Sequence, residues 1–333
     1  MKVMVIANLI NVYLNVGLIY GSENVDVFLN LANVHLQNQN FNKAIKNYEN
    51  AIRLKPDDPN MYHNLAVVWT KLNKIDNAIQ NYLKAIKLNS NNSFTYYNLG
   101  FLYSQHFSFS LSPLKKAELY FKKAININPN NAKFFYNLAW IQTKIGKYNS
   151  AIKNYKQSIK IDRNYFEATY NLSRLFLALE NFQEGWPIYD KLRVNKFKTN
   201  YEYKKIFKNI LKLKKWNGKK FNGKLFIYGE QGIGDQIVFS SMIPDLYKRH
   251  SNISLVVEKR LVSLFKRSFK DIIINEYNNK IKINSNDCQL PMFSLGSFFR
   301  KSINSFNPQS YIIPDSKKTN CYKKILSKNK KIK

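Results

Sequence analysis

The sequence predicts an array of paired helices followed by a smaller α/β domain built on a parallel sheet. Two observations carry this prediction. A short motif recurs five times over the first two-thirds of the 333 residues, and the last third alternates short apolar runs with helical patterns. Strands that alternate with helices along a chain form parallel sheets. A chain of this length holds enough apolar residues for two cores.

We divide the chain into five segments. They are residues 1–24, an N-terminal helix or degenerate capping repeat; residues 25–195, five helical repeats; residues 196–223, a basic linker helix; residues 224–315, the α/β domain; and residues 316–333, a basic tail. The first 20 residues are apolar, but Asn8, Asn11 and Asn15 interrupt them and no small-residue cleavage site follows. We therefore expect an amphipathic helix there in preference to a signal peptide or a membrane segment.

The repeated motif is Asn-Leu followed by a small residue. Its asparagines are Asn30, Asn64, Asn98, Asn137 and Asn171, at spacings of 34, 34, 39 and 34 residues. In the first four repeats a second motif follows, in which small residues flank an aromatic one, as in Ala44, Tyr48 and Ala51. Small residues let paired helices approach closely while the aromatic ring fills the gap between them. The sequence therefore predicts one helix pair for each repeat.

Two repeats depart from this pattern. The third contains a five-residue insertion between Gln105 and Pro113, which we expect to lengthen the turn between its two helices. The fifth has Gly185 where the alanine belongs, with Trp186 beside it. We expect this tryptophan to pack on the following domain.

This pattern resembles the tetratricopeptide repeat, a helix–turn–helix unit of 34 residues. The resemblance places the five asparagines on the concave side of the array. They could cap or bridge neighbouring helices. Alternatively, similarity to the asparagine ladder of the O-linked N-acetylglucosamine transferase repeats implies that they hold the backbone of a bound polypeptide, because an amide both donates and accepts hydrogen bonds. Both interpretations stay open.

The linker is strongly basic. From Lys196 to Lys224 it contains eleven lysines and a single acid, Glu202. An apolar stripe runs through it at helical spacing; its members are Tyr203, Ile206, Phe207, Ile210 and Leu211. We favour a helix that packs this stripe on the next domain over one that lies on an anionic membrane surface.

The α/β domain begins with a short buried strand, Leu225 to Tyr228. Gly229, Gly232 and Gly234 then allow a tight turn, and Asp235 follows at a helix start. Further strands are expected at 253–257, 272–274 and 288–292, helices at 261–269 and 294–301, and an extended piece at 311–313. In α/β proteins, a strand, a glycine turn and a helix with an acidic residue at its start form a ligand crevice.

Composition narrows the classes of ligand. The net charge of +32 favours acidic partners, yet the chain has only 8 Arg beside 45 Lys, and Arg is the residue that reads bases and phosphates in bidentate fashion. Specific nucleic-acid binding is therefore disfavoured.

Cys288 and Cys321 lack metal-ligand spacing and the four histidines are scattered, so we predict no metal site and a reducing, cytoplasmic location. The glycine turn lacks the Lys-Ser/Thr of a phosphate loop and the glycine spacing of a dinucleotide site.

A second resemblance rests on motifs that fall in matching order. They are Glu184-Gly-Trp186, Arg193, Trp216-Asn-Gly218, Gly229-Glu-Gln-Gly-Ile-Gly-Asp235, Phe239, Pro244-Asp-Leu246, Arg260-Leu261, Arg267-Ser-Phe269, Asp287-Cys-Gln-Leu-Pro291, Ser294-Leu-Gly-Ser297, Arg300 and Tyr311-Ile-Ile-Pro-Asp315. Together they look like bacterial proteins that join tetratricopeptide repeats to a heptosyltransferase-like glycosyltransferase. That family has the GT-B fold, in which two Rossmann-like domains face each other, and it transfers a sugar from a nucleotide-sugar donor without a metal or other cofactor.

The resemblance implies roles for named residues. Asp235 would be the catalytic base that deprotonates the acceptor hydroxyl, although the same residue could merely cap its helix. Substrate would lie against Glu230, Gln231, Gly232, Gly234, Asp287 and Ser294. In such relatives a second domain builds most of the donor site. We expect this sequence to hold the first Rossmann-like half, with Lys331 to Lys333 as the start of the second.

The resemblance therefore implies a truncated glycosyltransferase whose repeats bind a protein partner or the acceptor, with a glycan and a protein as the two candidate acceptors. The alternative is a non-catalytic scaffold of repeats that mediates protein–protein interaction, and a weaker one is a polyanion-binding protein. We expect a cytoplasmic protein, with peripheral contact at the inner membrane through the basic linker as an alternative.

Overall fold

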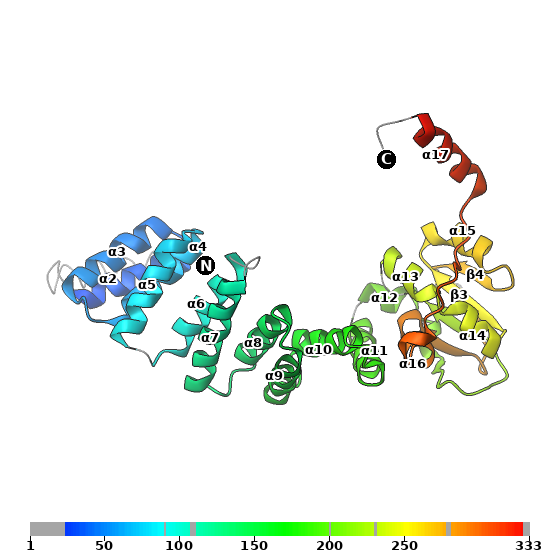
Figure 1. Cartoon of the computed structure of the whole chain (residues 1–333), viewed down its shortest axis with the longest axis horizontal. Helices are drawn as coiled ribbons and strands as arrows, with labels where there is room; N and C mark the ends of the chain where they lie inside the picture. The colour runs from blue at the N-terminus through cyan, green and yellow to red at the C-terminus, as the bar shows by residue number, and fades with distance from the viewer. Residues whose placement is uncertain are drawn as a thin grey trace. The chain divides into compact units, whose positions relative to one another are not determined.

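The computed structural model describes residues 24–89, 91–106, 111–199, 201–229, 232–277 and 281–328, without the side chains of 106, 193–199, 202, 203 and 328. The helix expected within residues 1–24 lies almost wholly outside this part of the chain. The structure divides into two compact units, Met1–Ala168 and Thr169–Lys333 (Figure 1). The fifth predicted repeat is therefore split off from the first four, and most of it belongs to the second unit.

The first unit consists of helix pairs. Its helices are α2 (Val25–Gln37), α3 (Phe41–Leu54), α4 (Pro59–Lys71), α5 (Ile75–Leu88), α6 (Ser93–His106), α7 (Leu111–Ile127), α8 (Ala132–Lys144) and α9 (Tyr148–Ile161). Asn24, Asp58 and Asn131 are N-caps whose side chains accept backbone N–H groups of the first turn. The turns of the first, second and fourth pairs contain a residue at positive φ, such as Asn73 at 57° and Gly146 at 79°.

The interior of each pair is filled by the residues that the repeat motif predicts. Tyr48, Tyr82, Phe121 and Tyr155 are fully buried on the second helices, and the small residues that flank each ring are buried with it. The predicted helix pairs are confirmed. The insertion in the third repeat is accommodated differently from our expectation. It goes mainly into a longer second helix, because α7 has 17 residues where α5 has 14, and only residues 107–110 separate α6 from α7.

The second unit begins with helices and continues into a sheet. Its helical elements are α10 (Phe166–Ala178, which contains the division between the units), α11 (Phe182–Thr199), α12 (Tyr201–Ile206), η1 (Ile210–Lys212), α13 (Ile233–Ser240), α14 (Ile243–Arg249), α15 (Lys259–Ser268), η2 (Met292–Leu295), α16 (Gly296–Phe299), η3 (Ile303–Ser305) and α17 (Ser316–Lys328). Its strands are β1 (Lys214–Lys215), β2 (Leu225–Tyr228), β3 (Ile253–Val257), β4 (Ile273–Glu276) and β5 (Cys288–Pro291).

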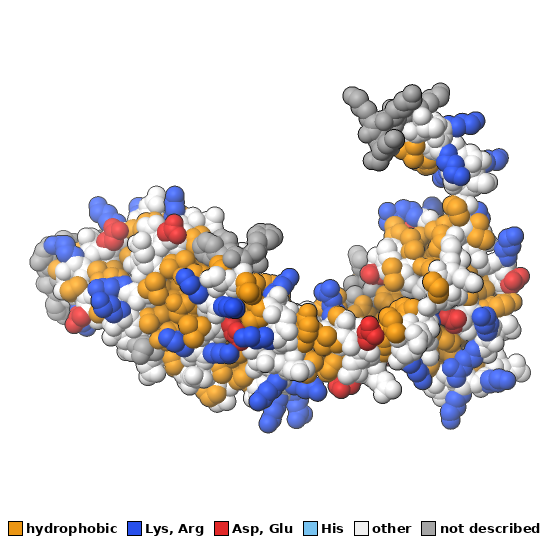
Figure 2. Space-filling view, viewed as in Figure 1, with side chains coloured by type: hydrophobic (Ala, Val, Ile, Leu, Met, Phe, Trp, Pro, Cys, Tyr) orange, Lys and Arg blue, Asp and Glu red, His pale blue; other side chains and the backbone are white. Residues whose placement is uncertain are grey.

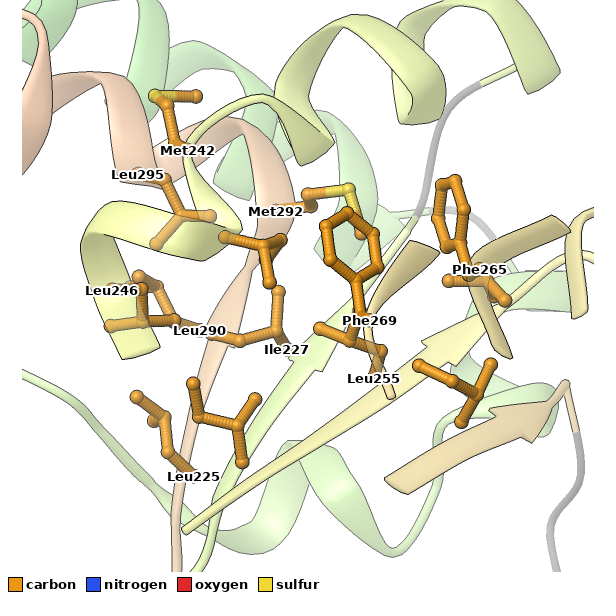
Figure 3. Packing of buried hydrophobic residues seen from close by; sticks show 14 of the residues in the cluster. Leu225, Ile227, Met242, Leu246, Leu255, Phe265, Phe269, Leu290, Met292 and Leu295 are labelled. Atoms are coloured by element: carbon orange, nitrogen blue, oxygen red, sulfur yellow. The ribbon is translucent and has the colours of Figure 1, made fainter. Parts of the chain in front are cut away.

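The strands form one sheet in the order β1-β5-β2-β3-β4, and every neighbouring pair is parallel. Strands β2, β3 and β5 are buried throughout, as expected when both faces of a sheet are covered. One face carries Ile227, Leu255 and Leu290, which pack against Leu246 and Phe265 from the helices (Figure 3). The parallel sheet agrees with the sequence prediction. Residues 311–315 form no strand.

The opposite face of the sheet is covered by the linker. Phe207 and Ile210 are buried against Phe226, Tyr228 and Val256, and Ile206 and Leu211 pack at the edge of this cluster. The apolar stripe of the basic linker therefore lies on the α/β domain, as we favoured, while Lys204, Lys205 and Lys208 are exposed. Within the part of the chain that the structure describes, no helix has the length and apolar character required to cross a membrane.

Trp186 is one of the residues through which helix α11 packs on the α/β domain. The ring of Trp186 lies against the backbone of Gly296, so closely that a Cβ added there would be 2.7 Å from the indole. It also meets the ring of Phe239 at a centroid distance of 6.4 Å. The expected packing of Trp186 on the following domain is confirmed.

Candidate functional site

The repeated asparagines form a row on the first helices of the repeats. In the first unit Asn30, Asn64, Asn98 and Asn137 lie on α2, α4, α6 and α8, and each is partly exposed. Asn171 occupies the corresponding place on α10 in the second unit and is also partly exposed. We call the four in the first unit the amide row.

The four asparagines of the amide row fall into two pairs. Asn137 Nδ2 donates to the Tyr97 hydroxyl at 3.1 Å and to the Lys133 carbonyl at 2.9 Å, and the Asn98 side chain shares a hydrogen bond with the hydroxyl of Tyr82. These two amides bridge neighbouring helices. Asn30 and Asn64 form no side-chain hydrogen bond within the described residues. Their amides therefore retain both donor and acceptor capacity at the surface.

Helix α6 departs from its neighbours in composition. It contains five aromatic residues and no Asp, Glu, Lys or Arg between Ser93 and His106. Tyr96 and Leu99 are buried in the core, yet Phe94 and Phe101 leave 53% and 39% of their surface exposed. Residues seven apart lie on one face of a helix, so these two phenylalanines form an exposed apolar stripe. Figure 2 shows hydrophobic side chains gathered over the repeat helices, with Lys and Arg side chains around them.

The exposed rings are supported by buried ones. Tyr97 stacks on Phe134 of α8 at a centroid distance of 4.9 Å and on Phe101 at 6.3 Å. Phe94 meets Phe134 edge-on at 5.6 Å. We call Phe94, Tyr97, Phe101 and Phe134 the aromatic shelf.

A cation and an amide border the shelf. The Lys133 Nζ lies 5.4 Å from the centroid of the Tyr97 ring, within range of a cation–π interaction. Burial, followed by the nearby Tyr165, raises the pKa of Tyr97 well above its ordinary value, so its hydroxyl stays protonated and can accept the Asn137 bond. Sequence reasoning missed the shelf. The absence of charge along α6 was the signal that could have found it.

The second candidate site is the glycine turn between β2 and α13. Asp235 lies in the first turn of α13 and is exposed, and the N-cap position belongs to Gly232. A carboxylate in the first turn is stabilised by the helix dipole. Gly232 and Gly234 are next to it and exposed, whereas Glu230 and Gln231 lie outside the described residues.

Gln236 holds the start of this turn. Its side chain is buried, donates to the Tyr277 hydroxyl at 2.6 Å and accepts from the backbone N–H of Glu258 at 3.2 Å. The Tyr277 hydroxyl in turn donates to the carbonyl of Gly229. A Cβ at Gly229 would lie 2.5 Å from Gln236, so glycine is needed there for space.

Two further residues proposed to bind substrate, Asp287 and Ser294, form hydrogen bonds within the fold. Asp287 precedes β5, at the amino ends of the strands, where its carboxylate accepts the backbone N–H groups of Lys224 at 2.9 Å and Asn284 at 2.7 Å. Ser294 is buried and donates to the carboxylate of Asp190 on α11. Asp287 thus lies at the edge of the sheet opposite to Asp235, whereas Ser294 follows the carboxyl end of β5 in η2, which contacts α13. Both are held in structural hydrogen bonds, which their polar character alone could not reveal.

Comparison with known families identifies the repeats. Residues 32–71, 68–106 and 141–179 match a family described as TPR repeat, and residues 120–153 match one described as tetratricopeptide repeat. These segments are tetratricopeptide repeats.

Individual relatives match over parts of the chain. FlbA of Caulobacter vibrioides is 32% identical over 107 residues, which are 31% of this chain and 17% of FlbA. Similar solved structures include YrrB, a TPR protein with an unusual peptide-binding site, at 19% identity with a TM-score of 0.47 over 54% of this chain and 90% of YrrB. MamA of Desulfovibrio magneticus RS-1 covers 53% of this chain and 97% of its own at 14% identity and a TM-score of 0.48.

Proposed function

We propose that the tetratricopeptide repeats bind an extended polypeptide segment of a protein partner along their first helices. The amide row is the observation that carries this proposal. An asparagine side chain presents one acceptor and two donors, the groups that a peptide backbone needs from its partner. Asn30 and Asn64 are partly exposed, and their amides have no hydrogen-bonding partner within the described residues.

The chemistry of the first unit also favours such a partner. Residues 24–168 contain 19 Lys and Arg against 8 Asp and Glu, so the surface attracts acidic polypeptides. An extended segment exposes its backbone N–H and C=O groups, which the amides can satisfy irrespective of its sequence. Additional selectivity then has to come from side-chain contacts.

The proposal is tested by selecting random-sequence peptides displayed on phage against the full chain. The affinity of a selected peptide is then measured by fluorescence polarisation for the wild type and for the double variant Asn30→Ala/Asn64→Ala. Two lost hydrogen bonds of about 1 kcal/mol each weaken binding about thirty-fold. Asn42→Ala, an exposed amide at the start of α3, is the matched control and leaves the affinity unchanged.

The outcome that contradicts the proposal is equally clear. If no peptide is enriched above background, or if the double variant binds all selected peptides as tightly as the wild type, the first helices are not the binding surface.

A second candidate function is sugar transfer at the glycine turn. The observation in its favour is the exposed carboxylate of Asp235 in the first turn of α13, just beyond the carboxyl end of β2. Ligand sites of parallel sheets lie beyond the carboxyl ends of the strands. In this proposal Asp235 removes the proton of an acceptor hydroxyl that attacks the sugar carbon of a nucleotide-sugar donor.

This candidate is tested with a panel of nucleotide sugars and measurement of the nucleoside diphosphate released. The expected result is release by the wild type that Asp235→Asn abolishes. Asp271→Asn, an exposed acid before β4, is the control and retains release. Equal release by the wild type and Asp235→Asn would remove Asp235 as the base, and no release by the wild type would remove the activity from this chain.

A further inference from the structure

We propose that the aromatic shelf is the specificity site of the repeats, and that it accepts a bulky apolar side chain of the partner segment with an Asp or Glu next to it. This inference rests on the proposed binding of a polypeptide. The inference specifies the side chains that the partner must carry and the residues of this chain that contact them.

The apolar part of the inference follows from the position of Phe94 and Phe101. The core-facing side of α6 is already filled, because Leu99 and Leu102 are buried and Gly100 approaches Phe121 so closely that a Cβ would lie 3.1 Å from that ring. The two phenylalanines are thus additional to what the fold requires. Exposed aromatic residues on one face of a helix are a common feature of surfaces that bind a partner.

The shelf is also held in a defined shape. Phe134 leaves only 1% of its surface exposed, and its ring contacts both Tyr97 and Phe94. Asn137 fixes the Tyr97 hydroxyl from the next repeat at 3.1 Å. Rings that are already ordered lose little conformational entropy on binding, which favours a selective contact with one side chain.

The acidic part of the inference follows from Lys133. Its Nζ lies over the Tyr97 ring at 5.4 Å from the centroid, and it forms no ion pair with any acid among the described residues. A carboxylate beside the apolar side chain would reach this ammonium group without losing contact with the shelf. The excess of basic residues over the first unit acts in the same direction.

The peptide selection described above, repeated with shelf variants, tests the inference. The full-length wild type should enrich peptides in which Phe, Tyr, Trp, Leu or Met stands beside Asp or Glu. The variant Phe94→Ser/Phe101→Ser should bind these peptides at least ten-fold more weakly. Leu119→Ser removes an exposed apolar side chain from the second helix α7 and should leave affinity unchanged. All three changed positions are on the surface, and circular dichroism verifies that each variant retains its helix content.

A charge reversal gives the sharper test. Lys133→Glu should shift the enriched neighbour of the apolar residue from Asp or Glu to Lys or Arg. Lys153→Glu makes the same change at an exposed site on the second helix α9 and should leave the acidic preference in place.

The outcomes separate the inference from the function on which it rests. The enriched peptides could lack an apolar–acidic pair, or Phe94→Ser/Phe101→Ser could bind them as tightly as the wild type does. Either result overturns the shelf as the specificity site while leaving peptide binding intact. A complete lack of enriched peptides overturns peptide binding itself. Displacement of selected peptides by single-stranded oligonucleotides, and not by excess unlabelled peptide, would assign the rings and lysine to nucleic acid and overturn the inference.

Discussion

The indole nitrogen of Trp186 donates a hydrogen bond of 2.7 Å to the backbone carbonyl of Arg300, 114 residues further along the chain. Arg300 is itself buried, and its guanidinium donates to Asp245 at 2.8 Å and to the carbonyl of Ser241 at 3.1 Å. Helix α11 is therefore tied to a polar network of the α/β domain. Helix α11, the last helix of the repeat array, and the sheet belong to one compact unit.

The close approach of Trp186 to Gly296 predicts a stability effect. Gly296→Ala places a methyl group 2.7 Å from the indole, and the ring cannot move away without breaking its bond to Arg300. We expect a loss of about 1–3 kcal/mol in the free energy of unfolding of the second unit, measured by urea denaturation. Gly234→Ala is the control, because nothing lies within 4 Å of a Cβ there, and alanine in a helix is neutral or stabilising. Equal behaviour of the two variants would contradict the packing.

The linker stripe predicts a second stability effect. Phe207→Ser exchanges a fully buried ring against Tyr228 and Tyr277 for a small polar side chain. We expect the second unit to lose about 3 kcal/mol or more, because a large buried ring leaves a cavity. Lys208→Ser changes the neighbouring exposed residue and should be almost neutral. If Phe207→Ser is as stable as the wild type, the stripe does not pack on this face of the sheet.

A buried carboxylate predicts how the first unit responds to pH. Glu118 on α7 accepts from Gln142 at 3.2 Å and pairs with Lys122 at 2.9 Å and Lys147 at 2.7 Å. Burial alone would raise the pKa of Glu118, but the hydrogen bonds from Lys147, Lys122 and Gln142 outweigh it and lower the pKa. A lowered pKa in the folded state means that this stabilisation is complete above the unfolded value of about 4.3 and disappears as the pH falls through the folded value.

The test compares Glu118→Gln with the wild type by urea denaturation across pH. At neutral pH the variant should be less stable by about 1–3 kcal/mol, because Lys122 and Lys147 lose their charged partner. The difference should shrink as the pH falls below about 4.3. A difference that stays constant with pH would show that the carboxylate charge is not what stabilises the α7–α8 contact.

Much of the fold could be predicted because apolar periodicity records burial. Strands β2 and β3 have the predicted bounds, and the buried residues of the second helices are those of the repeat motif. Strand β1 was not predicted, because Lys214 and Lys215 are exposed at the sheet edge and carry no apolar signal. The insertion was assigned to a turn because length alone does not distinguish a longer loop from a longer helix.

The candidate sites were less predictable. The asparagine spacing located the amide row, but only the structure separates Asn98 and Asn137, which bridge helices, from Asn30 and Asn64, which do not. Asp287 and Ser294 were grouped with Asp235 by resemblance, whereas the fold uses them for backbone and helix contacts. The shelf went unnoticed because Phe94 and Phe101 occur in a helix that is apolar on its buried side as well.

Site-specific photo-crosslinking tests the central claim most directly. The photoreactive analogue p-benzoylphenylalanine replaces Phe101 on α6 in one protein and Leu119 on α7 in another, and each is irradiated with a labelled peptide from the selection. Binding along the first helices predicts a crosslink from position 101 and none from position 119. A crosslink from position 119 alone would place the peptide on the second helices and contradict the account.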